Sequence, residues 1–122
     1  MKLKIGVLLL FFVLPITGIC NYQKEMDLQE KAAQSELVVI ARVDSIYEAG
    51  CKVNFICARL HVEKFLKGSA EGDLQFAFHG PLAELNSTCC KSGKYYLVFL
   101  KKLDSSNWAS VNGPFGVYDL PE

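Results

Sequence analysis

The sequence predicts a mainly β domain: a small closed or nearly closed barrel of five or six strands, with one short N-terminal helix and disulfide cross-links. Two observations support this prediction. Short segments of alternating apolar and polar residues recur along the chain with turn residues between them, as is typical of small barrels. Four cysteines follow an apparent export signal, and such cysteines commonly form a disulfide framework in small secreted domains.

The first twenty residues have the features of a secretory signal peptide. Two lysines precede the apolar run Ile5–Leu14, and a less hydrophobic segment ends at Cys20. The run is too short for the roughly 20 apolar residues that a membrane-spanning helix needs, and no other segment is longer, so we predict no transmembrane span. Cleavage after Cys20 is favoured because Gly18 and Cys20 are small. The alternative is a lipid anchor on Cys20.

The mature chain is predicted to be one domain that covers residues 21–122. Its 102 residues suffice for a single core but not for two. Because Lys2 and Lys4 leave with the signal peptide, 11 basic groups face 13 acidic groups, a formal net charge of −2. Proteins that bind nucleic acid present a basic face, so nucleic acid is not a predicted partner.

The cysteines of the mature chain are predicted to form two disulfides. An even number remains, namely Cys51, Cys57, Cys89 and Cys90. A bond between Cys89 and Cys90 would close a strained eight-membered ring, so each is predicted to bond back to the segment from Cys51 to Cys57. Such links would close loops of roughly 30 to 40 residues and stabilise the fold by about 3 to 4 kcal/mol on the chain-entropy estimate.

A zinc site built from cysteines together with His61 and His79 is the alternative. Structural zinc motifs usually separate paired ligands by two to four residues, whereas five residues lie between Cys51 and Cys57. The sequence therefore predicts no metal and no cofactor, with both histidines at the surface.

The N-terminal half of the mature chain is predicted to contain a helix and three strands. The segment Tyr22–Ser35 is rich in helix-forming residues. Leu37–Tyr47 is a strand that is apolar on both faces at its start and shifts phase near Ser45, which indicates a bulge. Ala58–Glu63 alternates with period two and is closed by Phe65–Gly68. The third strand, Leu74–His79, ends at Gly80-Pro81.

The most β-prone run of the chain is Tyr95–Leu100, which is predicted to be the central strand. Asp104–Asn107 then forms a hairpin turn, Trp108–Val111 the return strand, and Phe115–Tyr118 a short final strand.

Four segments of the chain, each found once, follow one another in an order that resembles a known family. They are Ser35–Val43, Val62–Gly68, Gly72–Leu74 and Cys90–Phe99. Together they resemble the bacterial netrin-like proteins, which are related to tissue inhibitors of metalloproteinases. The resemblance implies an OB-like barrel of five strands with a helix packed beside it.

The chain departs from the animal inhibitors at its predicted mature start. Those inhibitors begin Cys-x-Cys, and the first cysteine chelates the zinc of the target protease. Here Cys20-Asn21-Tyr22 lacks the second cysteine. Metalloprotease inhibition is therefore an alternative function that would require cleavage just before Cys20.

No catalytic motif is present: the sequence contains neither G-x-S-x-G nor H-E-x-x-H nor a glycine-rich phosphate loop. We therefore predict that the chain is not an enzyme but a secreted or periplasmic binding module, most simply for another protein. A lipid-anchored structural protein of the envelope is the rival. The predicted contact surfaces are the loops Glu48–Phe55 and Pro81–Thr88, because loops on a rigid barrel commonly bind. The candidate residues are Glu48, Lys52, Asn54, Glu84 and Asn86, and Asn86 also begins a glycosylation sequon.

Overall fold

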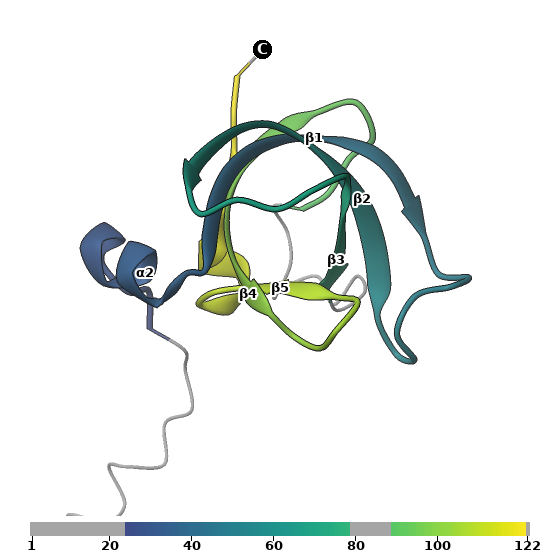
Figure 1. Cartoon of the computed structure of the whole chain (residues 1–122), viewed down its shortest axis with the longest axis horizontal. Coiled ribbons are helices and arrows are strands. Elements are labelled where there is room, and N and C mark those ends of the chain that lie inside the picture. Colours follow the sequence, from purple (N-terminus) through teal and green to yellow (C-terminus); the bar gives the residue numbers. More distant parts are fainter. Residues whose placement is uncertain (1–23, 79–88, 122) are drawn as a thin grey trace, which may run out of the picture.

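The structure is a computed structural model that describes residues 24–78 and 89–121 (Figure 1). Its elements in chain order are α2 (Leu28–Gln34), β1 (Leu37–Tyr47), β2 (Ile56–Lys67), β3 (Leu74–Phe78), β4 (Tyr95–Lys102), β5 (Trp108–Ser110), the 3-10 helix η1 (Gly113–Gly116) and β6 (Val117–Asp119).

Five strands close into a mixed barrel. The neighbours run β1, β2, β3, β5, β4 and back to β1, all antiparallel except β3 and β5, which run parallel. The sixth strand, β6, pairs with β4 outside this ring. Figure 1 shows the strands enclosing the interior, with α2 outside the barrel wall. The predicted fold class, a small OB-like barrel with one short helix, is confirmed.

β1 is bent and forms two of the barrel's seams. It pairs with β4 from Leu37 to Arg42 and with β2 along nearly its whole length. Its observed bounds are those predicted from the sequence. The register with β2 shifts between Val43 and Ser45, which leaves Asp44 as an extra residue. The bulge predicted near Ser45 is thus present, and a bulge of this kind bends a strand into a barrel wall.

The core has two parts. The larger part fills the barrel with inward-facing residues from every strand, and its largest fully buried side chain is Tyr96. The Tyr96 hydroxyl accepts a hydrogen bond from the backbone N–H of Lys91 at 2.9 Å, so its polar atom is satisfied. The smaller part lies on the outer side of β1 and β4 and contains Val38, Phe99 and Val111. This second cluster explains why the start of β1 is apolar on both faces.

The helix α2 is half as long as the predicted helix Tyr22–Ser35. Asp27 caps it, because its carboxylate accepts the backbone N–H of Glu30 at 2.8 Å. Residues 24–26 lie outside the helix and contact the barrel instead: the backbone N–H of Met26 donates to the Asn112 side chain at 2.7 Å. The residues before Asp27 favour a helix by composition, but the Asp27 cap and the hydrogen bond from Met26 to Asn112 make the helix begin at Leu28.

Lys31 joins α2 to the barrel from a fully buried position. Its side chain is 0% exposed. Its ammonium donates to the Phe115 carbonyl at 2.7 Å and to the Tyr118 hydroxyl, and it lies 4.8 Å from the centre of the Tyr118 ring. Glu25 is the only carboxylate paired with it among the described residues, at 3.5 Å. A buried charge needs such partners, so Lys31 fixes how the helix sits on the barrel.

The C-terminal segment differs from the prediction. A strand was expected at Phe115–Tyr118, but the chain first forms η1 and enters β6 only at Val117. Asn112 has a left-handed backbone, and the N–H of Phe115 donates to its carbonyl at 3.0 Å. Pro114 follows with a fixed φ that suits the start of a helical turn. The local turn therefore delays the strand by two residues.

Two glycines permit close backbone approaches. A Cβ on Gly68, whose φ is +76°, would overlap the carbonyl oxygen of Glu36, and one on Gly116 would overlap that of Val111. Gly72 has a similar φ of +74° but open space around it. Gly68 is thus required by both its conformation and its surroundings, and Gly72 by its conformation alone.

Candidate functional site

The loop between β1 and β2, residues Glu48–Phe55, is built from two consecutive turns. The backbone N–H of Cys51 donates to the Glu48 carbonyl, and that of Phe55 to the Lys52 carbonyl, each at 3.0 Å. Asn54 has a φ of +71°, a conformation that asparagine tolerates better than most residues. The loop therefore has a defined backbone, although it lies at the surface.

A disulfide between Cys51 and Cys57 closes this loop, with the two Cα atoms 5.6 Å apart. The predicted links from Cys89 and Cys90 back to this segment are wrong, because Cys51 and Cys57 bond to each other. The reason lies in the path of the chain. The two consecutive turns fold the loop back on itself, so that Cys51 lies next to Cys57 at the start of β2.

A salt bridge ties the loop to the turn between β4 and β5. The ammonium of Lys52 lies 3.2 Å from the Asp104 carboxylate. That carboxylate also accepts the backbone N–H groups of Ser106 and Asn107, each at 2.9 Å. These contacts lower the pKa of Asp104 from 3.8 to about 2. The hydrogen bond from the Ser106 N–H contributes most, followed by those from the Asn107 side chain and Lys52. Asp104 therefore stays ionised in the folded protein even in quite acidic solution.

The salt bridge is the outer end of a polar network that reaches across the barrel wall. The Asn107 side chain donates to Asp104 at 2.9 Å and accepts from the Gln75 amide at 2.6 Å. Gln75 in turn accepts from the Tyr47 hydroxyl at 2.7 Å. The network thus runs from Lys52 through Asp104, Asn107 and Gln75 to Tyr47. It connects both sides of the loop to β3 and to the entrance of β5.

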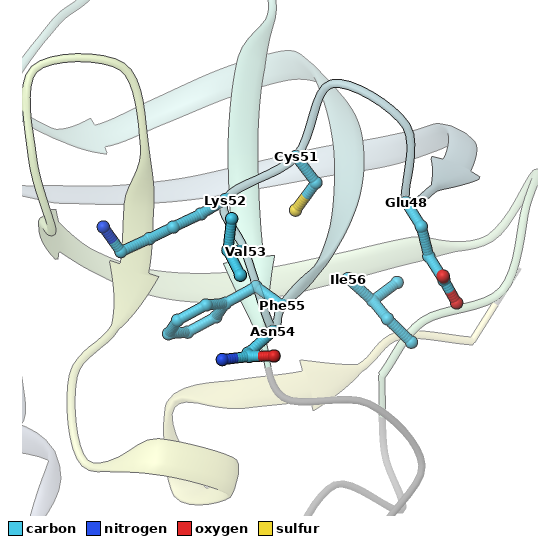
Figure 2. Close-up of a pocket in the computed structure, with 7 residues that line it drawn as sticks. All are labelled: Glu48, Cys51, Lys52, Val53, Asn54, Phe55 and Ile56. Atoms are coloured by element: carbon cyan, nitrogen blue, oxygen red, sulfur yellow. The ribbon is translucent and has the colours of Figure 1, made fainter.

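An open hollow of about 490 Å³ lies at the loop, and Figure 2 shows its lining side chains. The lining residues are Glu48, Cys51, Lys52, Val53, Asn54, Phe55 and Ile56. Val53 is 80% exposed, the most exposed of the large apolar side chains among the described residues. Glu48 and Lys52 extend to opposite sides of the loop in Figure 2, so the hollow has an acidic and a basic flank.

The structure brings three of the five candidate residues together. Glu48, Lys52 and Asn54 all line the hollow. Glu84 and Asn86 lie outside the described residues, as does the rest of the loop Pro81–Thr88. The sequence analysis did not single out Val53 or Asp104. An apolar residue inside a polar turn was the available signal for Val53, whereas nothing in the sequence places Asp104 beside Lys52.

A second group of polar side chains lies on the outer face of β1, β2 and the start of β3. Asp44, His61 and Asp73 are all exposed, and one potential ligand atom from each lies within 4.8 Å of the others. His61 is at the surface, as predicted, with its side chain 47% exposed. The other histidine, His79, lies outside the described residues.

Comparison with known proteins gives no family for this chain. No protein-family model matches it, and no curated protein does. Among residues 24–78 and 89–121, no helix has the length and apolar character needed to cross a lipid bilayer.

Proposed function

We propose that this chain is an exported, non-catalytic binding module that contacts a protein partner through the β1–β2 loop. The observation that carries the proposal is the exposure of Val53 on a loop held by covalent and polar links. The Val53 side chain is 80% exposed, so it has no packing role among the residues that the structure describes. On a loop closed by the Cys51–Cys57 bond, it is available to a partner at a fixed position.

The rigidity of the loop favours binding. Association costs about 0.5 to 1.5 kcal/mol for each flexible side chain that becomes ordered, and more when a loop must order. The disulfide, the two turns and the Lys52–Asp104 salt bridge restrict this loop before any partner arrives. An interface with an apolar centre and a charged rim is typical of protein recognition. Val53 between the flanks of Glu48 and Lys52 offers that arrangement.

The proposal of export has two supports: the signal-like residues 1–20 and a disulfide, which persists in oxidising compartments. The resemblance of four strand segments to the netrin-like proteins agrees with a binding role. The intact mass of the exported protein tests this part of the proposal. A mature chain that starts at Asn21 is expected, whereas retention of residues 1–20 on a cytoplasmic protein would refute export.

The binding role is tested with two matched variants of the full exported chain. Val53→Asp places a charge at the proposed contact, and Leu66→Asp does the same at an apolar residue that is 51% exposed on β2. Chemical cross-linking in the producing cells should yield the same adduct for the wild type and Leu66→Asp, and lose it for Val53→Asp. If the Val53→Asp protein is folded and forms the adduct as the wild type does, the loop is not the contact surface.

A further inference from the structure

Strands β1 and β2 and the residue just before β3 bring an imidazole and two carboxylates together on the outer face of the barrel. Arg42 pairs with His61 across β1 and β2, and the bulge that follows adds Asp44 on the β1 side. The last pair of β2 with β3 is Leu60 with Leu74. His61 and Asp73 each lie one residue beyond that pair, so continuation of the antiparallel register places them opposite each other. The cluster therefore follows from the sheet register.

The spacing of these groups is close to that of a metal site. His61 Nδ1 lies 3.2 Å from Asp73 Oδ1, and all three ligand atoms lie within 4.8 Å of one another. In a tetrahedral zinc site with bonds of about 2.1 Å, neighbouring ligand atoms are about 3.4 Å apart. One pair already has that separation. Rotation of the exposed Asp44 side chain, which exchanges its contact with Arg42 for the metal, supplies the remaining movement of up to about 1.4 Å.

The surroundings of His61 also favour a cation. Its Nδ1 faces Asp73 at 3.2 Å and its Nε2 faces Glu63 at 3.9 Å. A protonated imidazole can donate from both nitrogens to these carboxylates, and a neutral one can instead offer its Nδ1 lone pair to a metal ion. A metal ion between Nδ1 and Asp73 would take the place of the proton there. It leaves the Nε2 N–H directed at Glu63, which is the carboxylate–histidine–metal arrangement common around zinc.

The local charge has the sign that a cation requires. Asp44, Glu63 and Asp73 bring three negative charges, and the guanidinium of Arg42 lies 2.8 Å from Asp44 and 3.6 Å from Glu63. We propose that Asp44, His61 and Asp73 bind one Zn²⁺ ion, with water at the fourth position. One imidazole and two carboxylates, open to solvent, suit zinc better than Mg²⁺ or Ca²⁺, which take six or more oxygen ligands.

The experiment is a Zn²⁺ titration of the untagged, full exported chain by isothermal calorimetry. The wild type is expected to bind one ion per chain. His61→Ala and Asp73→Asn are each expected to weaken binding at least tenfold. His79→Ala is the matched control, because it removes the chain's other histidine, and its affinity should equal that of the wild type. Thermal unfolding without metal should show all variants folded, since the changed residues in the cluster are exposed.

Further measurements distinguish a zinc site from a merely acidic surface. Nuclear magnetic resonance of the histidine ring should show the His61 nitrogens shifting with Zn²⁺ and not with equal Mg²⁺. Glu63→Gln should weaken zinc binding severalfold, because Glu63 only orients the ring. The proposal is overturned if the wild type shows no saturable Zn²⁺ binding. It also fails if His61→Ala binds as tightly as the wild type, or if Mg²⁺ displaces Zn²⁺ at equal concentration.

Discussion

Removal of the Cys51–Cys57 bond should destabilise the barrel by an amount that identifies the connectivity. The two cysteines are six residues apart in sequence. The chain-entropy relation gives about 2 kcal/mol for so short a loop at 25 °C, against about 3 to 4 kcal/mol for a bond from this segment to Cys89 or Cys90. Cys57 is fully buried, and loss of its sulfur adds about 1 kcal/mol of lost packing. The variant Cys51→Ala/Cys57→Ala should therefore lose about 3 kcal/mol.

Equilibrium unfolding in urea measures this loss, with the non-reduced wild type as reference. For a domain of this size the melting temperature should fall by about 10 to 20 °C. The control is Cys89→Ala/Cys90→Ala. Because Cys51 and Cys57 bond to each other, Cys89 and Cys90 are left with no long loop of the chain to close, so this variant should stay within about 1 kcal/mol of the wild type. Peptide mapping of the non-reduced protein should recover Cys51 and Cys57 in one disulfide-linked fragment pair.

Two results would refute this reasoning. If the map finds Cys51 or Cys57 joined to Cys89 or Cys90, the structural pairing is wrong and both variants should lose similar amounts of stability. If the map agrees but Cys51→Ala/Cys57→Ala unfolds as the wild type does, the loop is already so restricted in the unfolded chain that the bond adds nothing.

Three further predictions concern stability. Lys31→Met keeps the apolar stem but leaves the partly buried Phe115 carbonyl without its donor, so urea unfolding should show a loss of about 1 to 3 kcal/mol. Gly68→Ala should lower the free energy of unfolding by about 2 to 4 kcal/mol in the same assay, and Gly72→Ala by only about 1 to 2 kcal/mol. Both glycines have a positive φ, but only Gly68 is crowded by neighbouring atoms. Equal losses for the two variants would contradict the role of this crowding. Asp104 has a pKa of about 2 when folded and 3.8 otherwise, so its contribution is present above pH 4 and lost as the pH falls toward 2. The urea midpoint of Asp104→Asn should therefore fall less steeply than that of the wild type over this range.

The sequence predicted those parts of the fold that depend on local pattern. β1 was predicted with its observed bounds, because its apolar start and later alternation are both visible along the chain. The bulge was visible as a break in phase. The start of the helix was predicted too early, because the prediction relied on composition and gave no weight to Asp27. An Asp followed three residues later by a Glu, here Glu30, is a recognised pattern for the start of a helix.

Contacts between distant segments could not be predicted from these patterns. The cysteine pairing was wrong because the argument considered sequence distance and ring strain but not the two turns that return the chain at Cys51. The sequence analysis did not single out Lys31, whose burial depends on the barrel residues that the helix packs against. The sequence analysis named the loop Glu48–Phe55 as a contact surface, but it did not single out Val53 within it.

The closure of the barrel and the placement of the loop depend on the same residues. β3 and β5 share a single bridging pair, Phe76 with Trp108, so this seam has the least backbone pairing of the five. The adjacent side chains of Gln75 and Asn107 strengthen it with a 2.6 Å hydrogen bond. Asn107 also donates to Asp104, the residue that anchors the loop through its salt bridge. A partner that holds the loop would therefore also stabilise the weakest seam of the barrel, because binding to the folded state alone raises its stability.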